Sequence, residues 1–581
     1  MITTDIFKQQ AVQILLPLVE EEESSLYSML ETPPSPELGD LAFPCFALAK
    51  SWRRAPQQIA MQLAQQINDH IQSSHDAPPI QIDAAGPYVN WRWERQHLGA
   101  ELLQSLAEPQ YTQLTIGQGQ RIILDMSSPN IAKPFGVGHL RSTVIGAALH
   151  RLYTAAGYEV IRVNHIGDWG TQFGKQITAH LRWHDPVQAA ADPIGEALRV
   201  YIKFHDEVEN HPELEDEARD WFRRLEHGDT EALELWHYFV KVSMASLDLM
   251  YQRLNVEFDE VLGESFYNDK MPAVVQQLQD AHLLEESDGA QVVRLDEYDM
   301  PPCLILKSDG TTIYPTRDLA TAIYRKQVMR GDRLVYVVGG EQTLHFRQVF
   351  AVLGKMGYEW ASDCIHVSFG LMKINGKKMS TRKGKVVFLE QVLDDAVQRA
   401  NDIINEKNPQ LPQREQVARQ IGIGAVIFND LKNYRQNEID FAPEAAVSFE
   451  GETGPYVQYV HARIQSILRR AQSQQQTESV PAAFLSSSVE HESWSDAAWE
   501  LICHLGRYRQ TLERAVQQHE PSVIARYALQ TARLFNQFYS RDRIVDAAPS
   551  ERAVRLKLTE LTGRYVKEML YLLGMEAPDQ M

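Results

Sequence analysis

The amino-acid sequence predicts a multidomain protein of α/β plus all-α class. Its 581 residues exceed what a single hydrophobic core supports, so three or four domains are expected. Between about 120 and 390, short apolar runs alternate with helical segments, which is typical of a parallel sheet with crossover helices. From about 395 onward the pattern is almost purely helical. We therefore expect a central parallel-sheet domain followed by a helical one.

The remaining boundaries follow from shifts in the same patterns. Residues 1–110 show helical periodicity in FKQQAVQILLPLV and PQQIAMQLAQQIN and alternation in IQIDAAGPYVNWRW, so we expect a separate N-terminal α+β domain. The parallel-sheet domain is expected at 111–390, with an acidic helical insertion at about 185–300. Its strand candidates are RIILDM, YEVIRVNHIG, RLVYVVGG and CIHVSFG. A helical connecting region at 391–450 and a C-terminal helical domain at 451–581 complete the chain.

Composition excludes several classes of protein. The first residues lack the basic and apolar regions of a signal peptide, and no apolar run reaches the roughly 18 residues of a membrane span. The four cysteines are scattered and form no C-x-x-C pair. Their spacing favours neither a zinc knuckle nor a disulfide framework, and we expect a cytoplasmic protein. They are Cys45, Cys303, Cys364 and Cys503.

The formal net charge of −20 argues against nucleic-acid binding, but its distribution is uneven. Between Asp206 and Glu234 there are 12 acidic residues and three arginines, whereas 501–550 holds seven arginines and four acidic residues. Binding depends on where basic residues lie, so the net charge lowers the expectation of an RNA partner without excluding it.

The first segment that suggests a ligand-binding role is DMSSPNIAKPFGVGHLRSTVIG, residues 125–146. A strand candidate leads through a polar turn into an amphipathic helix that begins near Gly138. The N-terminus of such a helix offers N–H groups to a phosphate, and Lys133 and His139 can donate to phosphate oxygens. Taken alone, the glycines are equally well explained as turn formers.

The second segment is FGLMKINGKKMSTRKGKVVFL, residues 369–389, in which lysines and Arg382 crowd a loop that also contains glycine and hydroxyl side chains. Such a loop can close over a polyphosphate and neutralise the charge that develops as pyrophosphate leaves. The alternative is a solvated basic loop or a nucleic-acid patch.

Together the two segments resemble the signatures of the class I aminoacyl-tRNA synthetases, which hold ATP from opposite sides of a Rossmann-type sheet. Residues 136–139 are called here the first signature, and residues 378–381 the second signature. The ordered series SSPNIAKPF, GHLRSTVIG, NHIGDWGTQFG, YPTRDLA and KMSTRKG resembles the arginyl-tRNA synthetases in particular. The resemblance extends to both ends of the chain. It implies a Rossmann-type catalytic domain, an N-terminal additional domain that touches the tRNA elbow and a C-terminal helical anticodon-binding domain.

Two positions depart from the pattern. Where the first signature usually begins with histidine, this chain has Gly136, so only His139 supplies an imidazole. The fourth position of the second signature is Thr381 instead of lysine. In arginyl enzymes a lysine upstream of the first signature is held to substitute, and here that residue is Lys133.

The resemblance implies an arginine–tRNA ligase that forms arginyl-adenylate from L-arginine and ATP and then loads the 3′ end of tRNA(Arg). It implies a monomer, Mg²⁺ carried with ATP, and no metal site in the protein. The implied catalytic residues are His139, Lys133 and Lys378. The implied ATP-binding residues are Gly136, Gly138, His139, Gly340, His345, Met379, Ser380 and Lys383. The implied arginine-binding residues are Asn130, Asn164, Tyr314, Asp318, Gln342 and Glu159.

Chemistry gives independent support to part of this pocket. A guanidinium is planar, charged and rich in donors, so a selective site should offer a carboxylate and an aromatic or amide wall. Tyr314 and Asp318 are four residues apart and share a face if their segment is helical. Asn164 and Gln342 follow strand candidates, and ligands gather at the carboxyl ends of parallel strands. Without the resemblance, an ion pair for Asp318 and packing for Tyr314 would be the simpler interpretation.

For tRNA, the resemblance points to the C-terminal helices, where aromatic residues stand beside arginines. Stacking on unpaired bases and contact with phosphates need this combination, although aromatic residues at helical spacing more often form core. The implied tRNA-binding residues are Tyr459, Arg463, Phe535 and Tyr539.

Three rival functions remain at this stage. A cysteinyl synthetase would need a zinc site, which the scattered cysteines do not favour. A small-molecule adenylyltransferase would not need the long helical region after the second signature. An RNA-binding protein with a decayed active site is favoured only by Gly136.

Overall fold

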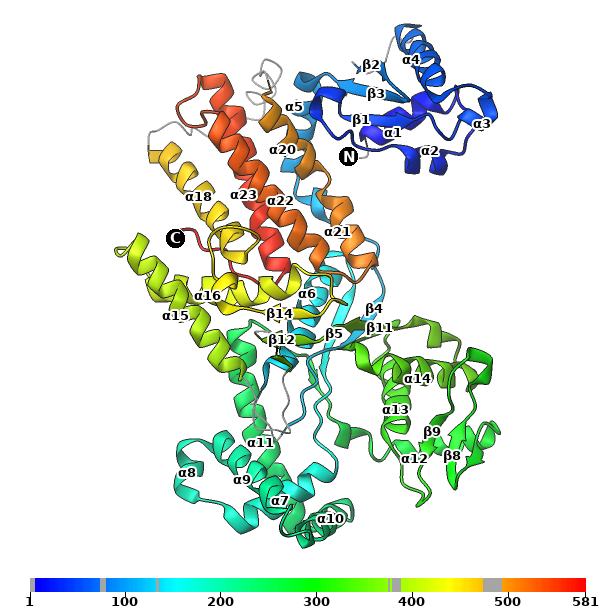
Figure 1. Ribbon diagram of the computed structural model, residues 1–581, viewed down its shortest axis with the longest axis vertical. Helices are drawn as coiled ribbons and strands as arrows, with labels where there is room; N and C mark the ends of the chain where they lie inside the picture. Colours follow the sequence, from blue (N-terminus) through cyan, green and yellow to red (C-terminus); the bar gives the residue numbers. More distant parts are fainter. Residues whose placement is uncertain (1–5, 74–79, 132–134, 375–376, 379–387, 474–493) are drawn as a thin grey trace.

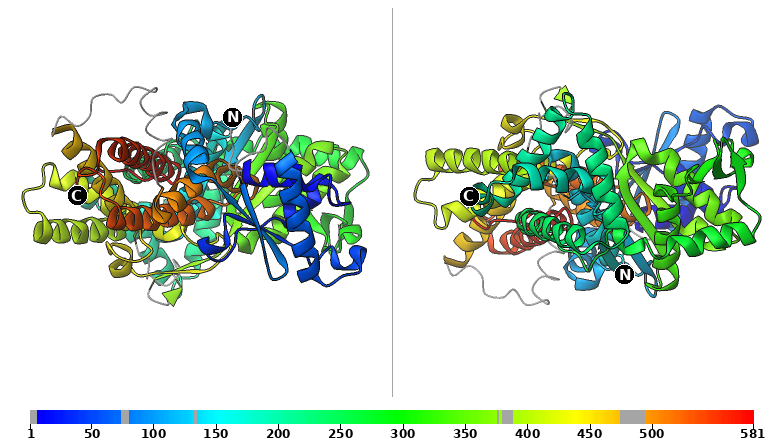
Figure 2. Two further views of the ribbon diagram at one scale, coloured as in Figure 1. Left: turned by 90° about the horizontal axis from the view of Figure 1, so that it is seen from above. Right: turned by 90° about the horizontal axis from the view of Figure 1, so that it is seen from below.

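The computed structural model describes residues 6–73, 80–131, 135–374, 377–378, 388–473 and 494–581. The molecule is elongated, with the central sheet in the middle (Figure 1). The N-terminal domain, in blue, and the C-terminal helices, in orange and red, form the upper end. Seen from below, the insertion helices and a smaller α/β unit lie side by side at the opposite end (Figure 2). This arrangement confirms the predicted fold class.

The N-terminal domain packs helices on a three-stranded antiparallel sheet of order β1-β3-β2. Val89, Trp91 and Trp93 share one face of β3 and are buried, and on the other face Tyr88 and Arg92 are partly exposed while Asn90 is buried. The strands are β1 (Leu41–Pro44), β2 (Ile80–Ala85) and β3 (Tyr88–Trp93). The helices are α1 (Ile6–Leu15), α2 (Glu23–Met29), α3 (Ala49–Trp52), α4 (Pro56–Ser73) and α5 (Arg95–Ala107).

The central sheet has five parallel strands in the order β11-β10-β4-β5-β6. Each of the four predicted strand segments forms one of them, because near-continuous apolar runs suit strands that are covered on both faces. The strands are β4 (Arg121–Asp125), β5 (Glu159–Asn164), β6 (Glu260–Val261), β10 (Arg333–Gly339) and β11 (Cys364–Phe369). The covering helices are α6 (Leu140–Ala155), α13 (Tyr314–Gln327) and α14 (Thr343–Lys355).

A helical insertion follows β5 and has its own small core, formed by Ala179, Val200, Phe204, Leu214 and Ala218. It consists of α7 (Thr171–Trp183), α8 (Pro186–Ala191), α9 (Pro193–Glu207), α10 (Glu213–Glu226) and α11 (Thr230–Arg253). The acidic stretch noted in the sequence therefore lies on α9 to α11.

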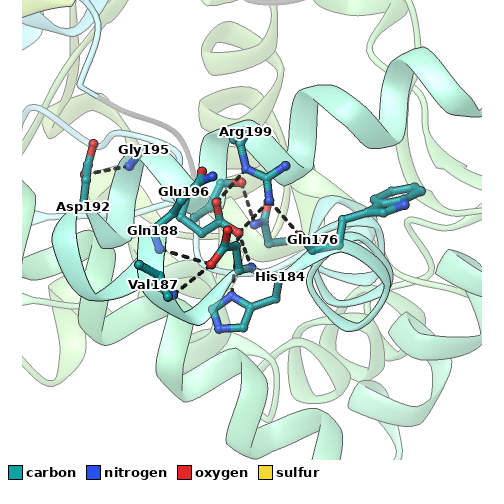
Figure 3. Close-up of polar contacts among 11 residues, drawn as sticks. Gln176, His184, Val187, Gln188, Asp192, Gly195, Glu196 and Arg199 are labelled. Carbon is teal, nitrogen blue, oxygen red and sulfur yellow. Dashed lines mark hydrogen bonds and ion pairs between the residues drawn. The ribbon is translucent and has the colours of Figure 1, made fainter.

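A buried carboxylate organises the turns of this insertion (Figure 3). Glu196, only 4 % exposed, accepts hydrogen bonds from Arg199 Nε at 2.7 Å and from the backbone N–H of Asp185 at 2.8 Å. The hydrogen bond from Arg199 lowers the pKa of Glu196. Asp185 and Asp192 in turn cap α8 and α9, contacts that each contribute about 1 kcal/mol to helix stability. The insertion is thus held together by its own polar contacts as well as its own core.

The expectation of a helical insertion over 185–300 is wrong in its second half. The chain returns to the central sheet at β6, because Val163 and Asn164 of β5 pair with Glu260 and Val261. Residues 285–306 then form a three-stranded antiparallel sheet instead of helices. Its strands are β7 (Glu285–Ser287), β8 (Ala290–Val293) and β9 (Cys303–Leu306), preceded by α12 (Met271–Asp280). Strands of three or four residues carry too little periodicity to be separated from helix in a sequence.

After the central sheet the chain forms a small sheet of order β13-β12-β14 and then helices. Its strands are β12 (Met372–Ile374), β13 (Lys377–Lys378) and β14 (Ile439–Phe441). The helices are α15 (Leu389–Lys407), α16 (Arg414–Leu431), α17 (Pro443–Ala446), α18 (Gly454–Ser473), α20 (Asp496–Gly506), α21 (Tyr508–Gln517), α22 (Ser522–Arg541) and α23 (Pro549–Leu572). Strand β14 is an exception to the predicted helical pattern.

The N-terminal domain is fastened to the C-terminal helices. The carboxylate of Asp40 accepts hydrogen bonds from the backbone N–H of Trp93 at 3.0 Å and from the indole N–H of Trp499 at 2.6 Å. Phe7 packs edge-on against both tryptophans. Arg95 adds an ion pair to Asp496 at 2.6 Å. The first and last domains of the chain are therefore in direct contact.

Candidate active site

Several of the site residues predicted from the catalytic region lie in segments that follow the carboxyl ends of central strands, among them Asn130 after β4 and Gln342 after β10. Parallel strands end at a common edge, and a ligand there meets the loops that follow each of them. After β4 the chain turns sharply, since Ser127 and Ser128 have φ values of 68° and 49°. Two successive non-glycine residues in the left-handed region are unusual and need support from their surroundings.

Asn164 supplies that support. Its Oδ1 accepts a hydrogen bond from the backbone N–H of Ser128 at 3.2 Å, and its Nδ2 donates to the Tyr251 hydroxyl at 3.0 Å. The Tyr251 hydroxyl also lies 2.9 Å from the hydroxyl of Ser127. Asn164 has no exposed surface. The expectation that Asn164 contacts arginine is therefore corrected: the residue is buried beneath the site and holds the turn that shapes it.

The first signature forms the short helix η3 (Val137–His139) at the start of α6. A bridge joins Gly136 to Phe388, so the first signature lies beside the segment that follows the second one. The His139 ring lies 5.4 Å from the ring of Phe135. Gly138 is exposed, with open space where a Cβ would lie. A ligand can thus approach the backbone here closely.

Several predicted residues lie outside the described part of the chain. They are Lys133, Met379, Ser380 and Lys383. Lys378 lies on β13, where its backbone pairs with that of Lys373 in β12. These residues keep the roles given above as predictions only.

The strand that leads toward the second signature is anchored to the helix that follows the first. Arg141 of α6 donates from Nη1 to the carbonyls of Gly370, at 2.6 Å, and Asn437, at 2.9 Å. Its Nε lies 3.2 Å from a carboxylate oxygen of Asp430, and both side chains are 1 % exposed. Gly370 lies between β11 and β12, so one buried guanidinium connects α6 and the segment that leads to the second signature with α16.

The predicted arginine pocket is built on α13. The helix begins at Tyr314, so Tyr314 and Asp318 share a face as expected. Tyr314 is 61 % exposed, and the Arg317 guanidinium lies over its ring at 5.9 Å from the centroid. Asp318 Oδ2 lies 2.5 Å from Nε2 of His345 on α14. His345, which was predicted to bind ATP, therefore contacts Asp318, which was predicted to bind arginine.

Two further carboxylates border this pocket and were missed in the sequence. Glu264 forms an ion pair with Arg317 at 3.0 Å, with side chains only 15 % and 12 % exposed. Asp168 accepts hydrogen bonds from the backbone N–H and the hydroxyl of Ser265, at 2.8 and 2.6 Å. Burial raises the pKa of Glu264 to about 7; Arg317 opposes the shift, while Asp318 and Asp168 add to it. Asp318 and Asp168 thus lie close enough to Glu264 to affect its charge, while Arg317 is its ion-pair partner.

The other predicted arginine-binding residues are spread more widely. Asn130 is exposed and forms a bridge with Gly167, at which a Cβ would lie 2.1 Å from Asn130 Oδ1. Gln342 is exposed at the end of η6 (Gly340–Gln342), which begins at the equally exposed Gly340. Glu159 does not lie at the predicted pocket. It is the first residue of β5 and pairs with Arg121 at 2.9 Å, at the edge of the sheet opposite the site.

The predicted tRNA-binding residues form a compact cluster on α18 and α22, with one exception. The Arg463 guanidinium lies over the rings of Tyr459 and Tyr539, at 4.7 and 5.4 Å from their centroids. It also donates to Asn536 Oδ1 at 2.7 Å. Tyr459 and Tyr539 are 38 % and 44 % exposed. Phe535 is fully buried and is corrected to a core residue, because it lies on the inner face of α22.

Two negative findings concern only the described residues. No group of three or more His, Cys, Asp or Glu side chains among them is arranged to hold a metal ion. In the same ranges, no helix has the length and apolarity needed to cross a membrane.

Comparison with protein-family models matches three consecutive parts of the chain. The family "tRNA synthetases class I (R), catalytic domain" matches residues 101–442. "Arginyl tRNA synthetase N terminal domain" matches residues 4–92, and "DALR anticodon binding domain" matches residues 457–581. Fold and site therefore define a class I aminoacyl-tRNA synthetase.

Individual relatives narrow this further. The arginine–tRNA ligase of Streptococcus mutans is 48 % identical over 574 residues, 98 % of each chain, and that of Streptococcus uberis is 48 % identical over 565 residues, 97 % of each. The chain belongs to the arginyl-tRNA synthetase family. Thermus thermophilus arginyl-tRNA synthetase superposes over 100 % of both chains with a TM-score of 0.81 and 25 % identity. The Plasmodium falciparum enzyme shares the fold, with a TM-score of 0.77, 20 % identity and coverage of 100 % of this chain and 98 % of that one.

Proposed function

We propose that the chain carries out its family's reaction at the carboxyl edge of the central sheet. The carboxylate of L-arginine attacks the α-phosphorus of ATP, giving arginyl-adenylate and pyrophosphate. The 3′-terminal ribose of tRNA(Arg) then attacks the carbonyl of the adenylate and AMP leaves. Such transfers depend on positioning and charge neutralisation more than on a strong base.

The observation that carries this proposal is the acidic pocket on α13. Asp318 offers a carboxylate for a bidentate contact with guanidinium, and Glu264 adds a second acidic group close by. Tyr314 provides the exposed aromatic wall, over which a guanidinium can stack. Asn130 and Gln342, both exposed at this edge, are assigned to the amino-acid end of the substrate.

ATP is assigned to the side of the site formed by the first signature. Gly138 is exposed and allows close backbone contact, and Gly136 and His139, its neighbours at the start of α6, are assigned to the same region. Gly340 and His345 are placed beneath the ribose. By analogy with the family, Lys133, Lys378 and Lys383 are proposed to neutralise the phosphates, and Met379 and Ser380 are proposed to bind ATP. Mg²⁺ is proposed to accompany ATP, and it is assigned no protein ligands.

The test is arginine-dependent exchange of pyrophosphate into ATP, measured with and without tRNA(Arg). Exchange with arginine, and none with lysine or cysteine, supports the proposal. A requirement for tRNA would show that the site is completed only in the complex. Absence of exchange under both conditions would favour an RNA-binding protein with a decayed active site.

The remaining domains are proposed to serve tRNA. Residues 1–110 are assigned to the elbow and 451–581 to the anticodon, while 391–450 connects the latter to the catalytic domain at 111–390. We also propose a cytoplasmic monomer. All four cysteines are buried free thiols, which suits a reducing compartment. Light scattering should give the mass of a single chain.

The affinity for arginine should depend on pH through Glu264. Its pKa of about 7 means that the carboxyl is protonated below pH 7 and must lose that proton to pair with a cationic substrate. The KM for arginine should therefore rise as pH falls below 7, by at most about tenfold per pH unit, and level off above 8. Steady-state kinetics between pH 6 and 8.5 measure this.

Glu264→Gln is the matched control, because the amide cannot titrate. Its KM should be high and nearly independent of pH. An identical pH profile in both proteins would assign the titration to another group.

Removing an aromatic ring from the C-terminal cluster should weaken tRNA binding. Base stacking on an aromatic side chain is worth about 1–3 kcal/mol, so Tyr539→Ala should raise the KM for tRNA(Arg) by about 5- to 150-fold. ATP–pyrophosphate exchange at saturating tRNA should change little. Tyr298→Ala, which removes an exposed tyrosine from a distant short helix, should leave the KM unchanged. Equal effects of the two substitutions would exclude a specific contact.

A further inference from the structure

One turn of the C-terminal helical domain touches the supports of both signatures. It consists of His519 and Glu520, between α21 and α22. His519 adopts a left-handed backbone conformation with φ of 52°, and Glu520 is 2 % exposed. Glu520 is also held locally, since its Oε1 accepts from the backbone N–H of Ser522 at 3.2 Å. The turn is therefore a fixed point of contact.

The first contact runs to the helix that follows the first signature. Nδ1 of His519 lies 2.7 Å from the hydroxyl of Tyr153 on α6. Burial lowers the pKa of His519 to about 4, so the ring is neutral at physiological pH and this is a hydrogen bond between neutral groups. Tyr153 itself is 1 % exposed.

The second contact runs through Arg435 to the end of a central strand. The guanidinium donates from Nε to the carbonyl of His519, at 3.1 Å, and from Nη1 to the carbonyl of Ser368 in β11, at 2.6 Å. Its backbone N–H donates to Glu520 Oε2 at 3.3 Å, and its side chain lies within 3.8 Å of the same oxygen. The Arg435 guanidinium thus bonds both to the C-terminal domain, at His519, and to the central sheet, at Ser368.

Arg435 also acts on the strand that leads to the second signature. Its carbonyl accepts a hydrogen bond from the backbone N–H of Gly370 at 2.9 Å. A Cβ at Gly370 would lie 2.5 Å from the carbonyl oxygen of Asn437, so this crossing is tight. A shift of Arg435 must therefore move the start of β12.

A cavity of about 300 Å³ lies between the central sheet and α21, and Tyr153 and His519 are themselves among its lining residues. Beside it, α6 also packs against α16, α21 and α23. The hydrogen bonds of Tyr153 and Arg435 are the polar connections between the His519–Glu520 turn and the supports of the two signatures.

We propose that Arg435 and Tyr153 are positioning residues through which the His519–Glu520 turn couples occupancy of the C-terminal domain by the anticodon to the arrangement of both signatures. The inference rests on the proposed anticodon role of that domain. It assigns the two residues an effect on kcat, whereas the aromatic cluster on α18 and α22 governs the KM for tRNA.

The test measures aminoacylation by the full-length enzyme with tRNA(Arg) and with transcripts in which each anticodon base is changed in turn. The variants are Arg435→Lys, which keeps the charge but cannot span both carbonyls, and Tyr153→Phe, which removes only a hydroxyl. Gln420→Ala is the matched control. It removes a hydrogen bond from α16 to Glu576, at 2.7 Å, that joins the same two regions away from both signatures.

For Arg435→Lys we expect kcat with tRNA(Arg) to fall by about 5- to 100-fold, with the KM for tRNA within about twofold of wild type. The loss of kcat caused by an anticodon change in the wild type should shrink toward unity, while its effect on KM persists. Tyr153→Phe should also lower kcat and reduce the anticodon effect on kcat, whereas Gln420→Ala should change neither quantity.

Three results would overturn the coupling. One is a kcat loss of equal factor for all transcripts with a matching fall in thermal stability, which marks a structural role only. Another is a wild-type enzyme in which anticodon changes affect KM alone. The third is an undiminished anticodon effect on kcat in both variants. If anticodon changes have no effect at all on the wild type, the proposed role of the C-terminal domain fails as well, which distinguishes the two failures.

Discussion

Asp318→Asn should reduce kcat/KM for arginine in ATP–pyrophosphate exchange by roughly 10²- to 10³-fold. The amide keeps the size of the carboxylate but removes the charge that faces a guanidinium. Truncating one partner of a buried, hydrogen-bonded charge pair costs about 2–5 kcal/mol. The loss should appear mainly in the KM for arginine, because the guanidinium of the substrate is the cation that loses its charged partner. Exchange kinetics at varied arginine and saturating ATP and tRNA measure it.

Asp299→Asn is a matched control, since Asp299 is exposed and its left-handed conformation suits asparagine. It should behave as wild type. If the KM values for ATP and for arginine rise by the same factor, Asp318 acts instead through its contact with His345 and affects the shape of the whole site.

Arg141→Met should lower the free energy of unfolding of the catalytic region by about 3–5 kcal/mol. The substitution leaves the 1 %-exposed carboxylate of Asp430 without its charged partner and removes the donor to the Gly370 and Asn437 carbonyls. Urea unfolding followed by fluorescence measures the shift in the transition that reports on this region. Exchange activity should fall too, because β12 loses an anchor.

Arg470→Met provides the comparison. Arg470 pairs with Asp546 at 3.2 Å, but the side chains are 59 % and 62 % exposed, so its loss should cost less than about 1 kcal/mol. A similarly small effect for Arg141→Met would mean that the buried ion pair contributes nothing beyond its desolvation cost.

Local patterns in the sequence predicted the strands and one face of the pocket. The apolar runs of β4, β5, β10 and β11 were recognisable because a strand covered on both faces has a near-continuous apolar sequence. Tyr314 and Asp318 were predicted to share a face, and they do because their spacing is that of a helix. Both are properties of a few consecutive residues.

Features that depend on distant segments could not be predicted. Glu264 and Asp168 join the pocket because loops after different strands meet at one edge, and no spacing rule connects them to Asp318. Asn164 and Phe535 each have a residue type that suits the predicted role, but neighbouring elements cover both side chains completely. Glu159 lies at the beginning of a strand whose end forms the site.

The contact between the N-terminal domain and the C-terminal helices has a consequence for synthesis on the ribosome. Arg95 and Asp496 are 401 residues apart in sequence. At about 5–20 residues per second, the tryptophan-bearing face of the N-terminal domain waits roughly 20–80 s before Trp499 emerges to cover it. During that interval the nascent chain presents an apolar surface that a holding chaperone can bind. In the finished enzyme the C-terminal helices cover that surface, because Trp499 packs against Phe7 and donates a hydrogen bond to Asp40.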